Sequence, residues 1–300
     1  SRFDGAVADP SGRWAVVYER TGTAGILLRD GEIVREIHRS PYHAEAFLYP
    51  VCLFRFRDRV VLAHCPDSYA RIEIDDAETG ERLTRSTTRR EADFFHSRLA
   101  VSPGGRRLVS AGWIWQPWDA VVWFDIAAAV ADPTSLDALD GTPASRDIGL
   151  VEECSAAWLS DDRILLGGSP ETEDPEAAAE IEREHPGPRL RPNGLAVYDI
   201  PSRAFVQSVD LGYPPGTMMP VGMHHVVTFY RRPRLVSLAS AKVVHEWSEI
   251  DAGEAVSSIV YDRRDPPLAL DPARARFAVA SERGIDVISI DVAALAGTPT

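Results

Sequence analysis

The feature that most constrains the fold is a short motif that recurs along the whole chain. Each copy is a basic residue followed by an apolar run, and the intervals between copies are 46, 48, 56, 62 and 51 residues. The copies begin at Arg13, Arg59, Arg107, Arg163, His225 and Arg276. A turn such as Ser102-Pro103-Gly104-Gly105 precedes most of them, because Pro presets φ and Gly accepts positive φ. One such unit cannot bury both of its faces, so we expect the copies to stack.

Around each motif the sequence predicts a small antiparallel sheet. Small and apolar residues before each turn predict first strands at 4–9, 50–55, 98–103, 154–159, 216–221 and 267–272. A third strand follows the motif and often ends near an acidic residue, as in Trp123-Phe124-Asp125. Alternating apolar and polar residues, typical of a half-exposed edge, predict outer strands at 32–38, 81–86, 203–209 and 242–247.

The outer strand is not expected everywhere. After Asp125 and after Asp291 the chain is rich in Ala, which favours helix and is depleted in strands. Residues 169–193 form an insertion between strands two and three of the fourth unit. Within it, Asp174 can cap a helix that starts at Pro175, and Pro186 follows the helix-forming stretch. The sequence therefore predicts a short acidic surface helix in this insertion.

Four antiparallel strands in a repeat of roughly 45 residues are typical of a propeller blade. The turn before the second strand and the aromatic-Asp end of the third strand resemble those of WD-repeat and YVTN-type propellers. This resemblance spans nearly the whole chain and implies an all-β fold, a six-bladed β-propeller of four-stranded antiparallel blades in one domain over 1–300. It also implies that ligands bind at the mouth of the axial channel. The face concerned is formed by the loops between strands two and three and between strand four and the next strand one.

Composition limits the partners. The net charge of −13 argues against nucleic acid and against a membrane surface, because both attract clustered Lys and Arg. No window of about 18 apolar residues is available to span a bilayer. The three cysteines, Cys52, Cys65 and Cys154, lack metal-ligand spacing and indicate free thiols in a reducing cytoplasm. No cofactor and no metal are expected, since no dinucleotide or phosphate-binding loop is present.

The loop that carries Trp113, Trp115, Trp118 and Asp119 is the most distinctive candidate site. Three tryptophans in six residues are costly to leave in water, at about 25 cal/mol per Å² of apolar surface. They either pack over the channel mouth as structure or line a ligand or partner site. Both interpretations remain open from the sequence.

Three residues that each precede a first strand are expected to ring the channel mouth, namely His96, Glu152 and Asp265. A histidine with carboxylates suffices for acid–base catalysis or for one metal ion. In the catalytic interpretation His96 titrates near neutrality and shuttles a proton, while Glu152 orients it or acts as a base. In the alternative interpretation all three are solvated loop residues. Antiparallel geometry further predicts that His96 and the tryptophan loop meet on one face.

Three further residues complete the candidate set. Arg231, in the equivalent loop of the fifth unit, is expected to hold an anionic group. His43 and Glu45 form either a ligand-binding pair or part of an ordinary surface loop.

Two functional hypotheses follow from these residues. The first is a non-enzymatic propeller that binds a small ligand or a protein partner on its loop-rich face. The second is an enzyme, a lyase, cyclase or hydrolase, with its site at the channel mouth. A serine hydrolase with a nucleophile elbow is disfavoured because Gly-x-Ser-x-Gly is absent. A deep pocket with convergent polar groups would favour the enzyme, whereas a broad apolar face would favour the partner.

Overall fold

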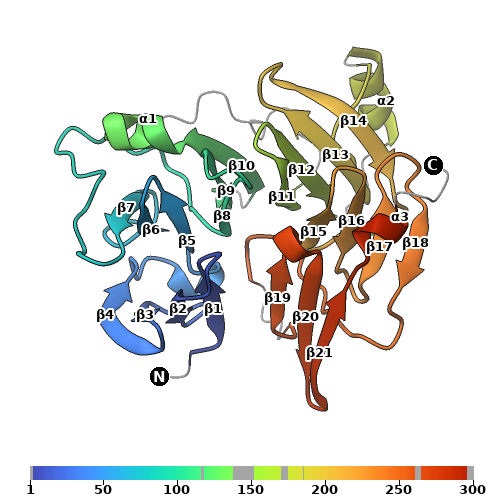
Figure 1. The fold of residues 1–300 in the computed structure, drawn as a ribbon. Coiled ribbons are helices and arrows are strands. Elements are labelled where there is room, and N and C mark those ends of the chain that lie inside the picture. Colours follow the sequence, from blue (N-terminus) through green and yellow to red (C-terminus); the bar gives the residue numbers. More distant parts are fainter. Residues whose placement is uncertain are drawn as a thin grey trace. The chain divides into compact units, whose positions relative to one another are not determined.

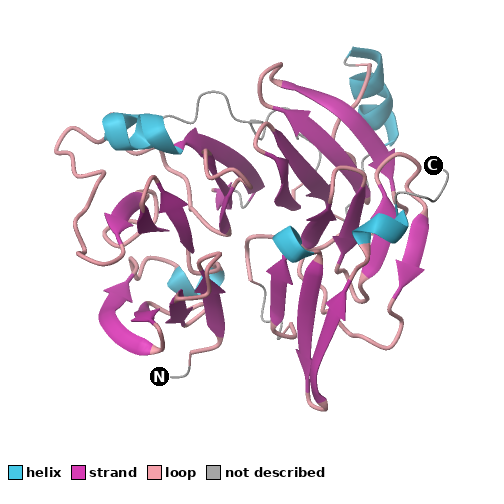
Figure 2. Ribbon diagram, viewed as in Figure 1, coloured by secondary structure: helices cyan, strands magenta, loops and turns pink. Residues whose placement is uncertain are grey.

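Six antiparallel sheets of three or four strands make up the fold (Figures 1 and 2). The structure, a computed structural model, describes residues 3–115, 118–137, 152–169, 175–184, 186–260 and 265–295. Contacts within the chain divide it into two compact units. One comprises Ser1–Ala144 and Ser258–Tyr261, and the other comprises Ser145–Ser257 and Asp262–Thr300.

The first unit holds three sheets, in which strands that follow one another in the chain pair antiparallel. Its strands are β1 (Gly5–Ala8), β2 (Trp14–Tyr18), β3 (Ala24–Arg29) and β4 (Glu32–His38); β5 (Val51–Phe56), β6 (Arg59–His64) and β7 (Glu73–Asp76); and β8 (Leu99–Val101), β9 (Arg107–Ile114) and β10 (Trp118–Asp125). Its helices are η1 (Ala44–Ala46), α1 (Ile126–Ala131) and η2 (Pro133–Leu136).

The second unit holds the other three sheets, paired in the same way. Its strands are β11 (Cys154–Ser160), β12 (Arg163–Gly168), β13 (Gly194–Asp199) and β14 (Ala204–Asp210); β15 (Met218–Val221), β16 (His225–Thr228), β17 (Arg234–Ser237) and β18 (Val243–Glu246); and β19 (Leu268–Asp271), β20 (Arg276–Ser281) and β21 (Gly284–Ser289). Its helices are α2 (Pro175–Glu184), η3 (Pro272–Arg274) and α3 (Val292–Leu295), and α2 lies in the stretch between β12 and β13.

The predicted second strands are confirmed. Five of the six begin at the expected residue, and β2 begins one residue later. The preceding turns show why the motif repeats, because a polar side chain of the turn accepts a backbone N–H at the start of the strand. Asp9 accepts the N–H of Trp14 at 2.9 Å, and Ser102 accepts the N–H of Arg107 at 3.1 Å.

The core lies between successive sheets, and β5 illustrates the geometry. Side chains alternate across a strand, so Val51 and Leu53 pack in one cluster with β2 and β3 while Cys52 and Phe54 pack in another with β9 and β10. First strands of successive sheets are also in contact, β1 with β5, β5 with β8, and β11 with β15. Both faces of these sheets are therefore buried, as stacked repeats require.

The outer strands differ from sheet to sheet. The outer strand predicted at 81–86 is wrong, since this segment joins β7 through a single bridge between Asp75 and Arg82. The side chain of Thr84 accepts the Ile74 N–H at 2.9 Å, so a hydroxyl takes the place of a ladder hydrogen bond. The helical turn predicted after Asp125 is confirmed as α1, and the segment after Asp291, expected to be poor as a strand, forms the short helix α3.

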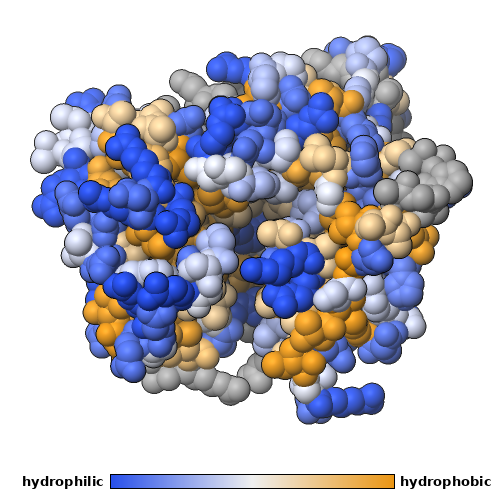
Figure 3. Space-filling model, in the orientation of Figure 1, coloured by the Kyte–Doolittle hydropathy of each residue, from blue (hydrophilic) through white to orange (hydrophobic). Residues whose placement is uncertain are grey.

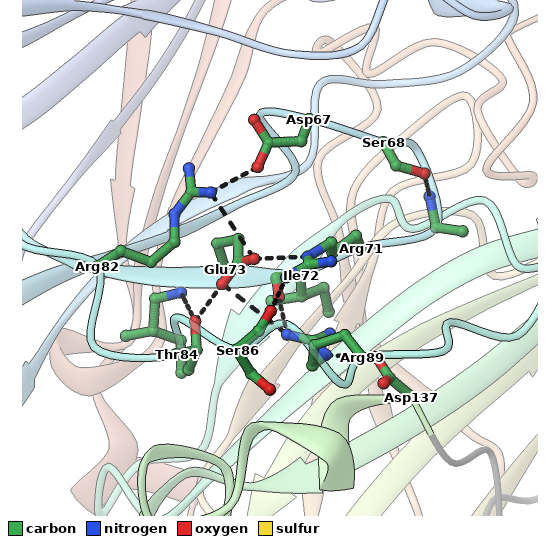
Figure 4. Close-up of polar contacts among 12 residues, drawn as sticks. Asp67, Ser68, Arg71, Ile72, Glu73, Arg82, Thr84, Ser86, Arg89 and Asp137 are labelled. Carbon is green, nitrogen blue, oxygen red and sulfur yellow. Dashed lines mark hydrogen bonds and ion pairs between the residues drawn. The ribbon is translucent and has the colours of Figure 1, made fainter.

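A buried charge network occupies this edge of the second sheet (Figure 4). Glu73, fully buried on β7, accepts hydrogen bonds from Arg71 Nε at 2.7 Å and from the Thr84 hydroxyl. Two more guanidinium groups, those of Arg82 and Arg89, lie 3.8 Å from its carboxylate. The Glu73 carboxylate thus links the strand to the irregular segment that replaces the outer strand.

Arg89 extends this network to the next sheet. Its buried guanidinium donates to Asp137 at 2.5 Å and to the Ile72 carbonyl at 3.2 Å. Asp137 follows η2, after the third sheet. Because a buried charge without its partners is costly, the network holds the 81–90 segment in a single arrangement.

Replacement of Glu73 by Ala is expected to lower the free energy of unfolding by about 3–5 kcal/mol, because it leaves buried guanidinium groups without a counter-charge. The matched control is Glu78→Ala, which removes an exposed carboxylate 2.7 Å from Arg29 and should cost less than about 1 kcal/mol. Urea unfolding followed by circular dichroism measures both changes. Equal losses for the two variants would contradict a structural role for Glu73.

Candidate functional site

The predicted tryptophan loop is the turn between β9 and β10. Trp113 lies opposite Asp119 in the ladder and is 3% exposed, whereas Trp115 at the turn is 47% exposed. Trp118 is partly buried at the start of β10. Residues 116 and 117 lie outside the described part of the chain. Each interpretation therefore fits one tryptophan. Trp113 is part of the core, whereas Trp115 faces solvent and is available to a ligand or partner.

Trp113 forms the inner end of a stack of aromatic rings. Trp113, Phe95 and Tyr69 follow one another with centroid separations of 3.8 and 4.1 Å, and Tyr42 packs beside the last two, 5.0 Å from Tyr69 and 6.0 Å from Phe95. The interplanar angles of 13°, 19° and 25° make successive rings nearly parallel. Each ring comes from a different connection or strand, so the stack ties together loops of all three sheets of this unit.

Two further rings meet the stack edge-on. Trp115 is perpendicular to Phe95, at 90° and 5.4 Å, and it makes a similar contact with His43 at 5.3 Å. Phe47 contacts Phe95 at 5.6 Å and 83°. Edge-to-face contacts of this kind add to the stability gained from burial. We call the surface formed by Tyr42, His43, Tyr69, Phe95, Trp113 and Trp115 the aromatic platform.

The platform carries the two most exposed Phe, Tyr or Trp side chains of the described residues. Among the described residues, Tyr42 at 48% and Trp115 at 47% are the two aromatic side chains classed as exposed, and both belong to it. The other exposed large apolar residues are aliphatic, such as Ile33 on β4 and Ile285 on β21. Figure 3 shows such apolar patches scattered among hydrophilic residues on the face in view.

A buried arginine holds the loop that carries Tyr42 and His43. Arg39 donates to the carbonyls of Gly22, at 2.7 Å, and of Ala44 and Phe47. Its guanidinium also lies over the Phe47 ring at 4.6 Å. Burial lowers the pKa of Arg39 to about 10, which leaves it charged at neutral pH. Arg39 therefore ties the 40–47 loop, through the carbonyls of Ala44 and Phe47, to the turn that contains Gly22.

Two carboxylates, those of Asp93 and Glu45, lie next to platform residues. Asp93 accepts the Tyr69 hydroxyl proton at 2.7 Å, and burial together with this hydrogen bond raises the pKa of Tyr69 to about 12. The His43 and Glu45 side chains, predicted as a pair, lie 3.6 Å apart at the surface. Both belong to the segment around η1, where His43 adopts a left-handed conformation with φ of 50°.

Asp119 has a structural role. It is buried and accepts hydrogen bonds from the backbone N–H of Ser258, at 3.1 Å, and from the Ser258 hydroxyl. The neighbouring Ile259 forms a bridge with Phe47 and packs against the ring cluster. Asp119 thus anchors a distant segment of the chain behind the platform.

His96 lies in the core, apart from solvent. It is 1% exposed, its Nδ1 is 3.1 Å from the Ser110 hydroxyl, and its ring packs 4.8 Å from Phe94. Burial, together with the nearby charge of Arg89, lowers its pKa to about 3. This neutral imidazole does not titrate near pH 7, and His96 is not part of the aromatic platform.

The remaining predicted residues belong to the second unit. Glu152 is exposed just before β11. Arg231 is ion-paired with Glu254 at 2.8 Å and lines an open cleft of about 680 Å³ together with Asp265. Asp265 accepts the Glu254 N–H at 2.7 Å. Arg231 and Asp265 already have partners within the cleft, so the platform is the stronger candidate for a binding site.

Sequence reasoning singled out Trp113, Trp115 and His43, but not Tyr69 and Phe95. These two rings lie in connections of different lengths. These rings could have been found from the sequence, because aromatic residues recur in connections that are expected at the same edge of neighbouring sheets. Their order in the stack depends on the tertiary structure.

The described residues contain no group of three or more His, Cys, Asp or Glu side chains placed to hold a metal ion. None of their helices is long and apolar enough to cross a membrane.

Buried neutral His96 should make stability fall as the pH is lowered. The unfolded chain takes up this proton below about pH 6.5, but the folded protein does not until about pH 3. The stability advantage of wild type over His96→Gln should therefore shrink by about 2 kcal/mol between pH 7 and pH 5. Denaturant unfolding at both pH values measures it, with exposed His38→Gln as the control. A pH-independent difference would contradict this assignment.

The two tryptophans should respond differently to truncation. Trp113→Ala removes a buried ring and is expected to cost about 3–5 kcal/mol, whereas Trp115→Ala should cost roughly 1 kcal/mol because half of this ring is exposed. Thermal and urea unfolding of both variants test this. Similar losses would mean that Trp115 is part of the core rather than a surface available to a partner.

Comparison with known proteins identifies the fold. No family model matches the sequence, and no curated protein is significantly similar to it. Among solved structures, a chain in the crystal structure of a mitotic checkpoint complex is similar over 95% of this chain and 76% of that chain, with a TM-score of 0.58 and 12% identity. Kuenenia stuttgartiensis hydrazine synthase is similar over 97% of both chains, with a TM-score of 0.50 and 14% identity. The chain thus has a β-propeller fold of the WD-repeat and YVTN-like kind.

Proposed function

We propose that this protein is a non-enzymatic propeller that binds a protein partner through the aromatic platform. The observation that carries the proposal is that the exposed rings of Tyr42 and Trp115 both pack against the buried ring of Phe95. Trp and Tyr are enriched among the residues that dominate binding energy, and such residues are surrounded by contacts that exclude water. The exposed aromatic area is thus concentrated where a partner gains most from covering it.

The platform is also rigid, which favours binding. The inner rings, Phe95 and Trp113, are buried, and Arg39 holds the loop of Tyr42 through backbone carbonyls. Side chains that are already ordered lose little conformational entropy when a partner docks. A mitotic checkpoint complex, an assembly that contains the same fold, supports a binding role.

We do not propose an enzyme at His96 and Glu152. His96 is buried with its pKa lowered to about 3, so it cannot exchange protons with a substrate at neutral pH. In the described part of the chain, no other arrangement of side chains favours a lyase, cyclase or hydrolase.

The proposed compartment is the cytoplasm. Cys52, Cys65 and Cys154 are all buried thiols that form no disulfide. Burial raises the pKa of Cys52 to about 12 and also raises that of Cys65, so these thiols stay protonated. Free thiols of this kind fit a reducing environment.

The proposal predicts that platform residues control partner binding. A random 12-residue peptide display library is selected on the wild-type protein and counter-selected on the Tyr42→Ala/Trp115→Ala double variant. Peptides recovered in this way should bind the wild type at least tenfold more tightly than the double variant, as measured by fluorescence anisotropy.

The control variant is Ile33→Ala, which removes an exposed apolar side chain from β4 in the same unit. It should leave the affinity for the same peptides within twofold. Circular dichroism and thermal melting check that each variant is folded. Failure to recover any peptide that depends on Tyr42 or Trp115 would overturn the proposed function.

A further inference from the structure

Two carboxylates next to the platform have no ion pair with Arg or Lys among the described residues. Glu45 pairs only with His43, and Asp93 only with the Tyr69 hydroxyl. By contrast, nine other carboxylates of this unit pair with arginines, namely Asp30, Asp67, Glu73, Asp75, Asp76, Glu78, Glu81, Asp119 and Asp137.

The buried charge of Arg39 does not neutralise this surface. Arg39 acts on Glu45 only at longer range, and its guanidinium is buried against Phe47 and Tyr49 rather than exposed. Glu91 adds a third negative charge near Tyr69, although it also lies near Arg71. The platform therefore presents aromatic rings beside carboxylates that lack a strong counter-charge.

We infer that the partner presents an arginine or lysine side chain to the aromatic platform, between Trp115 or Tyr42 and the carboxylates of Glu45 and Asp93. This inference rests on the proposed function and names the chemistry of its partner. Ring faces attract cations, and a planar guanidinium can stack on a ring while donating to a carboxylate. The net charge of −13 adds long-range attraction for a basic segment.

The test uses the platform-dependent peptides from the display selection, labelled with fluorescein, together with copies in which every Arg and Lys is replaced by Gln. We expect every platform-dependent peptide to contain Arg or Lys. The Gln copies should bind at least tenfold more weakly. The Glu45→Gln/Asp93→Asn double variant should weaken binding of the original peptides at least fivefold. Both substitutions keep an acceptor oxygen at each position, so hydrogen bonds such as that from Tyr69 are retained.

A charge-matched control separates local recognition from general attraction. Glu32→Gln/Asp58→Asn changes the net charge of the protein by the same amount at two exposed positions of the same unit. It should change the affinity less than twofold. Equal losses for the two double variants would overturn the inference, as would platform-dependent peptides that bind without any basic residue. Either of these two outcomes would leave the proposed function standing. A selection that yields no platform-dependent peptide would overturn the inference and the proposed function together.

Discussion

The structure depends on sheets that are packed on both faces. In β5 the alternation of Val51 and Leu53 with Cys52 and Phe54 places neighbouring residues in two different cores. A single sheet with two apolar faces cannot bury both of them by itself, so each sheet derives stability from the sheets packed against it. This constraint explains why the motif must recur, and why small and apolar residues occupy the first strands.

Where this regular pattern ends, polar interactions take over. The 81–90 segment has no outer strand, and the Glu73 carboxylate with three guanidinium groups occupies that edge instead. A buried ion network of this kind adds little net stability over an apolar edge, but it is costly to break and so favours one arrangement. The network also precedes Phe94 and Phe95, so it restrains the connection that brings Phe95 into the ring stack.

The platform is a consequence of the same scaffold. Connections from three sheets meet at one edge, and their rings stack because Trp113 and Phe95 are already buried against each other at 3.8 Å. Tyr42 and Trp115 extend this buried stack to the surface. Exposed rings supported in this way keep a defined geometry, and loops on a rigid scaffold are where binding residues concentrate.

The sequence by itself determined the second strands and their order along the chain. Regular spacing of motif, turn and apolar run is a local signal, so the starts of β6, β9, β12, β16 and β20 could be predicted to the residue. The outer strand expected at 81–86 could not be corrected locally, because the Thr84 hydroxyl replaces the ladder only in the presence of the buried Glu73.

Only the tertiary structure decided the roles of the candidate residues. His96 and Trp115 look equally functional in the sequence, yet His96 is enclosed by Phe94 and Ser110 while Trp115 reaches solvent. The burial of a side chain and the stacking of its ring depend on segments far apart in the chain, from Tyr42 to Ile259. The spacing of residues within one segment therefore cannot predict them. The physical reason is that exposure depends on what the other loops cover.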